Sequence, residues 1–254
     1  MASAELIRKP ACRLIVVGGH TRSIGKTQLV CDMIAALPRA RWLAGKITQY
    51  GHGVCAQNGG NCDCAPTEHV AALDWEDAGI PLTHRGADSA RFLQAGAERA
   101  FWLRTKQGYL AEGMPLLRQA LRQAKLRGKE AEDGGLKPPL HGDSECDCSS
   151  EVLNVIIESN SLLQFVRPSL YVTVLDAARE DFKDSARHML DRADVLVFRR
   201  GPEDGEVRRP PWLQLPAQFL RDKLSLLQRE GEPLPESLFQ LVSRILETGP
   251  TVSL

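Results

Sequence analysis

The segment from Leu14 to Val30, LIVVGGHTRSIGKTQLV, constrains the fold more than any other part of the chain. It begins with a short apolar run and continues through a glycine-rich turn to the triplet Gly25-Lys26-Thr27. Apolar residues then recur at helical spacing and predict one buried face, formed by Leu29, Val30, Met33, Ile34 and Leu37. We therefore expect a strand, a tight loop and a helix in direct succession.

This succession is the setting in which a phosphate-binding loop occurs. Backbone N–H groups at a helix N-terminus and the helix dipole both favour an anion there. Lys26 is expected to reach the terminal phosphates, and the Thr27 hydroxyl group to bind Mg²⁺. The alternative is a glycine-rich strand–helix turn that carries a surface lysine. The predicted phosphate-binding residues are Gly19, His20, Thr21, Arg22, Ser23, Ile24, Gly25, Lys26, Thr27 and Gln28.

The loop departs from the common G-x4-G-K-[ST] spacing at one position. The first glycine of that pattern would stand where this chain has His20, and Gly19 lies one residue earlier. The chain therefore carries the pattern G-x5-G-K-T.

Strand-like and helix-like segments alternate after this loop. Val152–Glu158 is a nearly continuous apolar run, as expected of a central parallel strand buried on both faces. The alternation predicts an α/β fold with a doubly wound, mostly parallel sheet. The other expected strands are Arg41–Thr48, Ala100–Arg104, Leu170–Leu175 and Val195–Phe198, and the expected helices are Ala87–Arg99, Met114–Lys125 and Asp181–Asp191.

The last part of the chain differs in composition. Residues 1–200 are expected to form the α/β domain, with cysteine-rich loops at 49–69 and 128–150. Residues 201–254 are expected to form a charged, proline-rich linker and a C-terminal helical extension. Its two helices, Leu213–Gln228 and Glu236–Glu247, are expected to pack on the edge of the sheet rather than to form a partner surface.

Composition excludes several classes of protein. The 254-residue chain has 32 basic and 32 acidic residues, so no overall positive charge favours nucleic acid or an anionic membrane surface. It has no apolar run of about 18 residues, which a transmembrane helix requires. Met1–Pro10 is charged and does not resemble a signal peptide. We expect a cytoplasmic protein that binds neither nucleic acid nor membrane.

Two charged residues are expected at the carboxyl ends of strands, where open α/β sheets bind ligands. Glu158 ends a buried strand and is expected to hold Mg²⁺ together with Thr27; a structural cap or salt bridge is the alternative. Lys46 lies near the end of a second strand and could stabilise charge on a transferring phosphoryl group. Asn160 and Ser161 follow Glu158 and could contact phosphate or water.

Asp88 and Arg91 are three residues apart and are therefore expected on one helical face. They could contact a ligand or metal. On spacing alone, a solvated ion pair is the favoured interpretation.

Five cysteines lie in the two long loops. Cys55, Cys62 and Cys64 occupy the first, with His52 and His69 close by. The second loop contains His141 and a C-x-C pair, Cys146 and Cys148. Thiolate and imidazole ligands suit Zn²⁺ or an iron–sulfur cluster, and free surface thiols are the alternative. Cys12 and Cys31 lie beside or within apolar segments and are expected to pack in the core.

Several stretches together resemble the molybdopterin-guanine dinucleotide biosynthesis protein B family. Gly86–Arg104 is similar to its G-K-D-S-x-R-x-x-x-A-G-A block, with Ala87 in place of the lysine. The strand GKITQYGH is similar to the strand that ends in Lys-His-Thr-His in that family, and Glu158 matches its Val-Glu-Gly segment. The other matching positions are Lys46, Thr48, Asp88, Ser89, Arg91, Ala95, Gly96 and Ala97.

The G-x5-G-K-T spacing is instead similar to dethiobiotin synthetase. Both families are P-loop NTPases that often act as dimers, so the resemblance implies a homodimer with that fold. It covers residues 12–200 and implies a GTP-binding accessory role in attaching a nucleotide to molybdenum cofactor. The cysteine-rich loops and the C-terminal helices are not part of that pattern. If the Asp-Ser-x-Arg block has the same role here as in that family, Asp88 and Arg91 shape a site for a second substrate.

Three hypotheses follow. The first is a Mg²⁺-dependent protein that binds or hydrolyses GTP or ATP in cofactor biosynthesis, with Lys26, Lys46 and Glu158 as catalytic residues and a second small-molecule or cofactor substrate. The second is a metal-delivery or cofactor-maturation NTPase that uses the C-x-C motifs. The third is a non-hydrolysing adaptor that binds a partner in its nucleotide-bound form.

Overall fold

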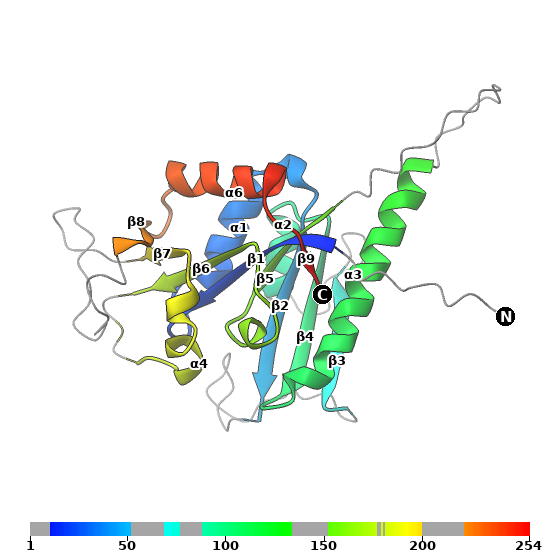
Figure 1. The fold of residues 1–254 in the computed structure, drawn as a ribbon, viewed down its shortest axis with the longest axis horizontal. Helices are drawn as coiled ribbons and strands as arrows, with labels where there is room; N and C mark the ends of the chain where they lie inside the picture. The colour runs from blue at the N-terminus through cyan, green and yellow to red at the C-terminus, as the bar shows by residue number, and fades with distance from the viewer. Residues whose placement is uncertain are drawn as a thin grey trace.

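The structure, a computed structural model, describes residues 11–51, 69–76, 88–133, 152–176, 179, 181–199 and 221–254. Within these ranges, nine strands form one sheet in the order β3-β4-β2-β5-β1-β6-β7-β8, and β9 also pairs with β1 (Figure 1). The strands are β1 Ala11–Gly19, β2 Leu43–Tyr50, β3 Ala71–Glu76, β4 Arg99–Lys106, β5 Leu153–Glu158, β6 Leu170–Leu175, β7 Val195–Phe198, β8 Leu224–Leu227 and β9 Val252–Ser253. The α/β class and the mostly parallel sheet are confirmed.

Two pairings are antiparallel, β3 with β4 at one edge and β9 with β1. The other pairings are parallel, so the carboxyl ends of β2, β5, β1 and β6 lie at the same edge of the sheet. The described helices are α1 Lys26–Ala36, α2 Asp88–Gln94, α3 Leu110–Asp133, α4 Asp184–Arg187 and α6 Glu236–Thr248, and short 3₁₀ turns span Pro38–Ala40, Ser161–Gln164 and Leu190–Arg192.

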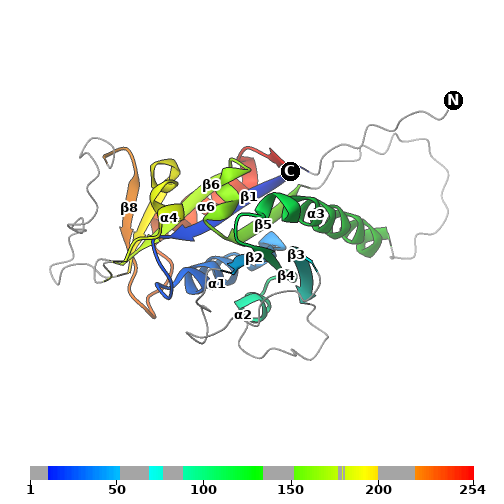
Figure 2. The same ribbon diagram turned by 90° about the horizontal axis from the view of Figure 1, so that it is seen from below.

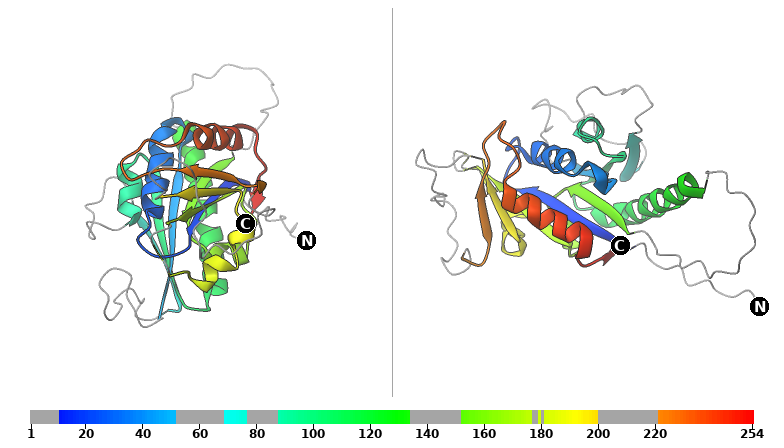
Figure 3. Two further views of the ribbon diagram at one scale, coloured as in Figure 1. Left: turned by 90° about the vertical axis from the view of Figure 1, so that its left-hand side faces the viewer. Right: turned by 90° about the horizontal axis from the view of Figure 1, so that it is seen from above.

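The apolar run of β1 supplies both faces of the sheet. Leu14 and Val16 pack in one buried cluster with residues of α3, whereas Ile15 and Val17 pack in a second cluster with residues of α1 and α6. Figure 2 shows α3 and α4 on one face and α1 and α2 on the other, and Figure 3 shows α6 over the same face as α1. A continuous apolar run in a strand corresponds to helices on both faces.

The prediction of a helix at Leu213–Gln228 is wrong in its described part, because Leu224–Leu227 forms strand β8 in parallel register with β7. Pairing with an edge strand satisfies the backbone hydrogen bonds of this segment and outweighs its local pattern. The predicted second helix is present as α6, and the chain returns to the sheet as β9. Residues 221–254 thus add two strands and one helix to the same layers, and not two helices.

Two predicted helices are shorter than expected. The helix expected at Asp181–Asp191 is a single turn, α4, followed by a 3₁₀ turn, and the helix expected at Ala87–Arg99 ends at Gln94, before β4. No helix within the described ranges combines the length and apolar character needed to cross a membrane.

Candidate functional site

The expected loop connects the end of β1 to the start of α1. Gly25 precedes α1 in the left-handed conformation, with φ of 83°, which glycine adopts without steric cost. Ile24 is buried in the cluster under α1 and anchors the loop to the sheet. The first N–H groups of α1 therefore follow a sharply turned loop that is anchored to the core, which is the backbone arrangement that an anion site requires.

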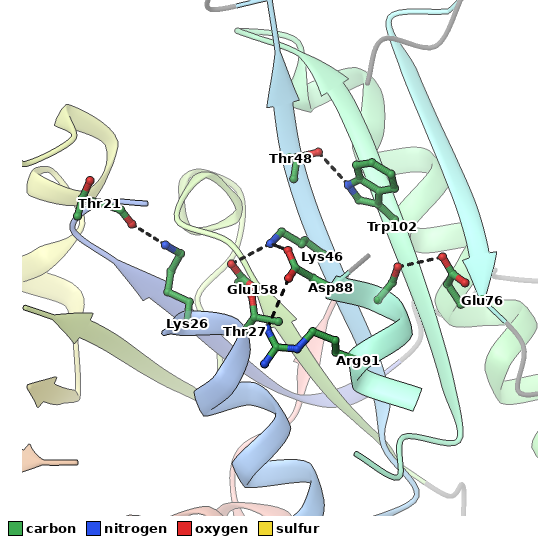
Figure 4. Close-up of polar contacts among 11 residues, drawn as sticks. Thr21, Lys26, Thr27, Lys46, Thr48, Glu76, Asp88, Arg91, Trp102 and Glu158 are labelled. Carbon is green, nitrogen blue, oxygen red and sulfur yellow. Dashed lines mark hydrogen bonds and ion pairs between the residues drawn. The ribbon is translucent and has the colours of Figure 1, made fainter. Parts of the chain in front are cut away.

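The Lys26 side chain folds back over this loop. Its Nζ donates a hydrogen bond to the Thr21 carbonyl oxygen at 2.5 Å (Figure 4). Burial lowers the pKa of Lys26, and the positive charges of Lys46 and Arg22 act in the same direction against the carboxylates of Glu158 and Asp88. A negatively charged ligand in the loop would relieve this unfavourable environment.

Glu158 stands at the centre of a chain of polar contacts. The Thr27 hydroxyl group donates to Glu158 Oε2 at 2.7 Å, and Lys46 Nζ donates to Glu158 Oε1 at 3.2 Å and to the Asp88 carboxylate (Figure 4). The register of the sheet brings Thr27, Lys46 and Glu158 together, because Glu158 lies opposite Val17 of β1 and Lys46 of β2. Residues from α1, β5, β2 and α2 therefore converge at one edge of the sheet.

The lysine of this cluster is held in its charged form. Burial acts to lower the pKa of Lys46, but the carboxylates of Glu158 and Asp88 outweigh it and raise the pKa above its usual value. Lys46 therefore carries a positive charge close to Lys26 at the start of α1. Glu158 is 5% exposed, so its carboxylate depends on Thr27 and Lys46 for the hydrogen bonds that water would otherwise supply.

Arg91 connects α2 to α1. It donates to the Gln28 side-chain oxygen at 2.6 Å and lies 4.0 Å from the Asp88 carboxylate. The Gln28 amide in turn donates to Asp32 at 2.7 Å. Arg91 thus contacts the first turn of α1 and Asp88 contacts Lys46 of β2, which is more than the isolated surface ion pair that spacing favoured.

Asn160 fixes the end of β1. Its side-chain amide accepts a hydrogen bond from the Gly19 N–H at 2.9 Å and donates to the Gly19 carbonyl at 2.8 Å. A Cβ atom at Gly18 would lie 2.3 Å from Asn160 Oδ1, so a glycine is required there. The amide of Asn160 is therefore engaged by the loop backbone.

Four residues that hold the loop and α1 in place were not assigned from the sequence: Asp181, Lys183, Arg199 and Gln228. Thr21 donates to the Asp181 carboxylate, and the Lys183 N–H donates to the His20 carbonyl at 2.9 Å. Arg199 donates to the Gly25 carbonyl at 2.7 Å and to Gln228, whose amide donates to Asp32 at 2.9 Å. These residues follow β6, β7 and β8, so their position beside the loop depends on the order of the strands.

The predicted magnesium ligands form a suitable donor set. The Thr27 hydroxyl and the Glu158 carboxylate are 2.7 Å apart, and Mg²⁺ prefers oxygen ligands.

Other residues of the predicted site lie at or near the same loop. Arg22 is half-buried and Ser23 is exposed in the loop. Ser161 begins a 3₁₀ turn directly after Asn160, and the Tyr50 hydroxyl donates to the His69 carbonyl at 3.1 Å.

The cysteine prediction concerns residues that lie outside the described part of the chain: Cys55, Cys62, Cys64, Cys146 and Cys148, together with His52 and His141. Among the described residues, no group of three histidine, cysteine or acidic side chains could hold a metal ion. Cys12 and Cys31 are buried and unpaired by disulfide, as expected of packing residues. Comparison of the chain with protein-family models, with curated proteins and with solved structures finds no match.

Proposed function

We propose that this protein binds a nucleoside triphosphate with Mg²⁺ in a P-loop formed by Gly19–Thr27 and uses the terminal phosphate in a reaction with a second substrate. The observation that carries the proposal is the convergence of Thr27, Lys46 and Glu158 next to the start of α1. This edge of a parallel sheet is where α/β proteins bind ligands.

Each part of the arrangement has a role in phosphoryl chemistry. The backbone N–H groups at the start of α1 and the ammonium group of Lys26 would hold the β- and γ-phosphates. Thr27 and Glu158 would hold Mg²⁺, which when bound neutralises negative charge on the phosphate oxygens. Lys46, kept charged by two carboxylates, would stabilise charge that develops on the transferring group.

The second substrate would bind beside Lys46, where α2 supplies Asp88 and Arg91. Lys46 contacts Asp88 directly, and Arg91 contacts Gln28 at the first turn of α1. A ligand that displaced either contact would therefore change the surroundings of Lys46 or of Gln28, next to the nucleotide. The resemblance of this block to molybdopterin-guanine dinucleotide biosynthesis protein B supports a role in cofactor biosynthesis, with GTP or ATP as the nucleotide.

Release of phosphate tests the catalytic part of the proposal. Purified full-length protein is incubated with Mg²⁺ and ATP or GTP, and inorganic phosphate is measured over time. We expect slow release that falls at least about tenfold in Lys46→Ala, because removal of one preorganised charge contact at a reacting group has that order of effect. Exposed Lys106 provides the control variant Lys106→Ala, which should keep wild-type activity.

The adaptor hypothesis predicts a different result. It requires tight nucleotide binding without turnover, both alone and with candidate acceptors present. Equal phosphate release by wild type and Lys46→Ala would contradict a role for Lys46 in the reaction.

A further inference from the structure

The unusual position 20 of the loop connects it to the segment that follows β6. The His20 side chain is fully buried, and its ring centroid lies 5.3 Å from that of Phe182. The His20 backbone donates to Val174 at 3.2 Å and accepts from the N–H of Lys183 at 2.9 Å. The residue that displaces the first glycine therefore fixes the backbone of Lys183 against the phosphate-binding loop.

A second anchor joins the residue after His20 to a residue two positions before Lys183. The Thr21 hydroxyl group donates to the carboxylate of Asp181, and this hydrogen bond holds the pKa of Asp181 below its usual value. Thr21 is also the residue whose carbonyl accepts from Lys26. The segment after β6 is thus attached at two points to the part of the loop over which Lys26 folds.

The Lys183 side chain has no role in this attachment. Lys183 is exposed, and within the described part of the chain its ammonium group has no hydrogen-bond or ion-pair partner. Its backbone position is nevertheless fixed by the bond to His20. A lysine that is held in place by its backbone, and on which the charges of Lys26 and Arg22 act, is suited to contact a ligand of that loop.

The charges around Lys183 favour an anionic ligand. Desolvation is the main cause that lowers the pKa of Lys183 to about 8, and the positive charges of Lys26, Arg22 and Lys46 add to the decrease. The carboxylate of Asp181 acts in the opposite direction. Three cations from the loop and from the segment after β6 therefore repel one another in the absence of a ligand. A polyphosphate is the class of ligand that such a cluster binds, because it presents several negative oxygens at once.

We propose that Lys183 is a further phosphate-contacting residue, which binds the terminal phosphate of the nucleotide from the segment after β6. The inference rests on the nucleotide-binding function proposed above. The charge of Lys46 acts on Lys26, and the charge of Lys26 acts on Lys183, so the three ammonium groups are electrostatically coupled. The terminal phosphate would then be held by lysines from β2, from α1 and from the segment after β6.

Calorimetric titration of full-length variants with Mg²⁺ and a nucleoside triphosphate tests the proposal. A hydrogen bond to a charged group corresponds to about a tenfold change in affinity or more. We expect Lys183→Ala to weaken triphosphate binding by about tenfold and diphosphate binding by less than about threefold. Lys183→Arg, which keeps the charge, should remain within about threefold of wild type for both ligands.

The controls separate this inference from the proposed function. Lys106→Ala removes an exposed lysine elsewhere and should bind both ligands like wild type. Because Lys183 is exposed, its variants should unfold at the wild-type temperature, which thermal denaturation checks. Equal triphosphate affinity of Lys183→Ala and Lys106→Ala, or an equal loss for diphosphate, would overturn the inference alone. Failure of wild type to bind any nucleotide would overturn the proposed function and this inference with it.

Discussion

The hydroxyl group of Thr27 donates a hydrogen bond to Glu158 across 2.7 Å, which joins the first turn of α1 to the last residue of β5. The two residues are 131 positions apart in the sequence. Parallel pairing of β1 with β5 brings them together, because Val17 lies opposite Glu158 and β1 leads directly into the loop. A hydroxyl and a carboxylate in contact at this place form the oxygen pair to which we assign Mg²⁺.

This pair predicts how magnesium affects nucleotide binding. In wild type, Mg²⁺ should strengthen binding of a nucleoside triphosphate. Thr27→Val and Glu158→Gln should each weaken the Mg²⁺-dependent affinity by at least about tenfold, because loss of a group that supports a metal ion has this order of effect. Titrations with and without Mg²⁺ measure the difference.

The matched control for this prediction is Glu98→Gln, which alters a solvent-exposed carboxylate paired with Arg41. It should leave the magnesium dependence unchanged. A Glu158→Gln variant that kept the full magnesium effect would remove Glu158 from the metal site.

The contacts of Lys46 predict a loss of stability when its charge is removed. Lys46→Ala would leave the buried carboxylate of Glu158 and that of Asp88 facing each other without a cation. Breaking a buried charge pair costs about 3 kcal/mol, and partial exposure of Asp88 reduces the cost here to about 2 kcal/mol. Urea unfolding without nucleotide measures the change in the free energy of unfolding.

A second substitution tests whether repulsion between the two carboxylates causes this loss of stability. Asp88→Asn in the Lys46→Ala background should restore part of the lost stability, because it removes one of the two repelling charges. Lys106→Ala, at an exposed site, should change stability by less than about 0.5 kcal/mol. Additive losses in the double variant would show that the two carboxylates do not interact through Lys46.

The pKa of Lys183 predicts the pH dependence of nucleotide binding. Its pKa is lowered to about 8 in the free protein, and a bound phosphate would raise it. Lys183 is protonated in both states below pH 8, so affinity is greatest there. Above pH 8 the free protein loses this proton, and affinity should fall until pH exceeds the pKa of the bound state.

Titrations between pH 7.5 and pH 9.5 test this dependence, over about two units around the cited pKa. Proton uptake on binding is measured by calorimetry in buffers of different ionisation enthalpy. It should be largest about half a unit above that pKa, at about pH 8.5. Lys183→Arg should lose the part of the pH dependence that Lys183 contributes, because arginine stays charged throughout, whereas Lys26, whose pKa burial also lowers, is unchanged. A wild-type affinity that is constant over this range would contradict the assignment.

The core of the fold could be predicted from the sequence because its signals are local. The apolar runs at Leu170–Leu175 and Val195–Phe198 became β6 and β7 with the expected bounds, and the glycine loop followed β1 as expected. Lys46 and Glu158 could be placed together because both stand at carboxyl ends of parallel strands. In these cases the local pattern and the final packing agree.

The remainder depends on contacts that no local pattern encodes. Leu224–Leu227 became a strand only because it pairs with β7, and β3 is an antiparallel edge strand that the alternation of strands and helices does not predict. Asp181 and Lys183 could not be assigned because their place beside the loop requires β6 to neighbour β1. The significance of His20 was likewise hidden until its contact with Phe182 was known.

The most direct measurement is the calorimetric titration of full-length protein and its Lys26→Ala variant with a Mg²⁺-bound nucleoside triphosphate. Lys26 folds over the loop and donates to Thr21, so a bound phosphate would take the place of that carbonyl as its partner. We predict saturable binding by wild type, loss of binding by Lys26→Ala and wild-type binding by Lys106→Ala. Absence of binding by wild type, or equal affinity in Lys26→Ala, would contradict the assignment of this loop to nucleotide phosphates.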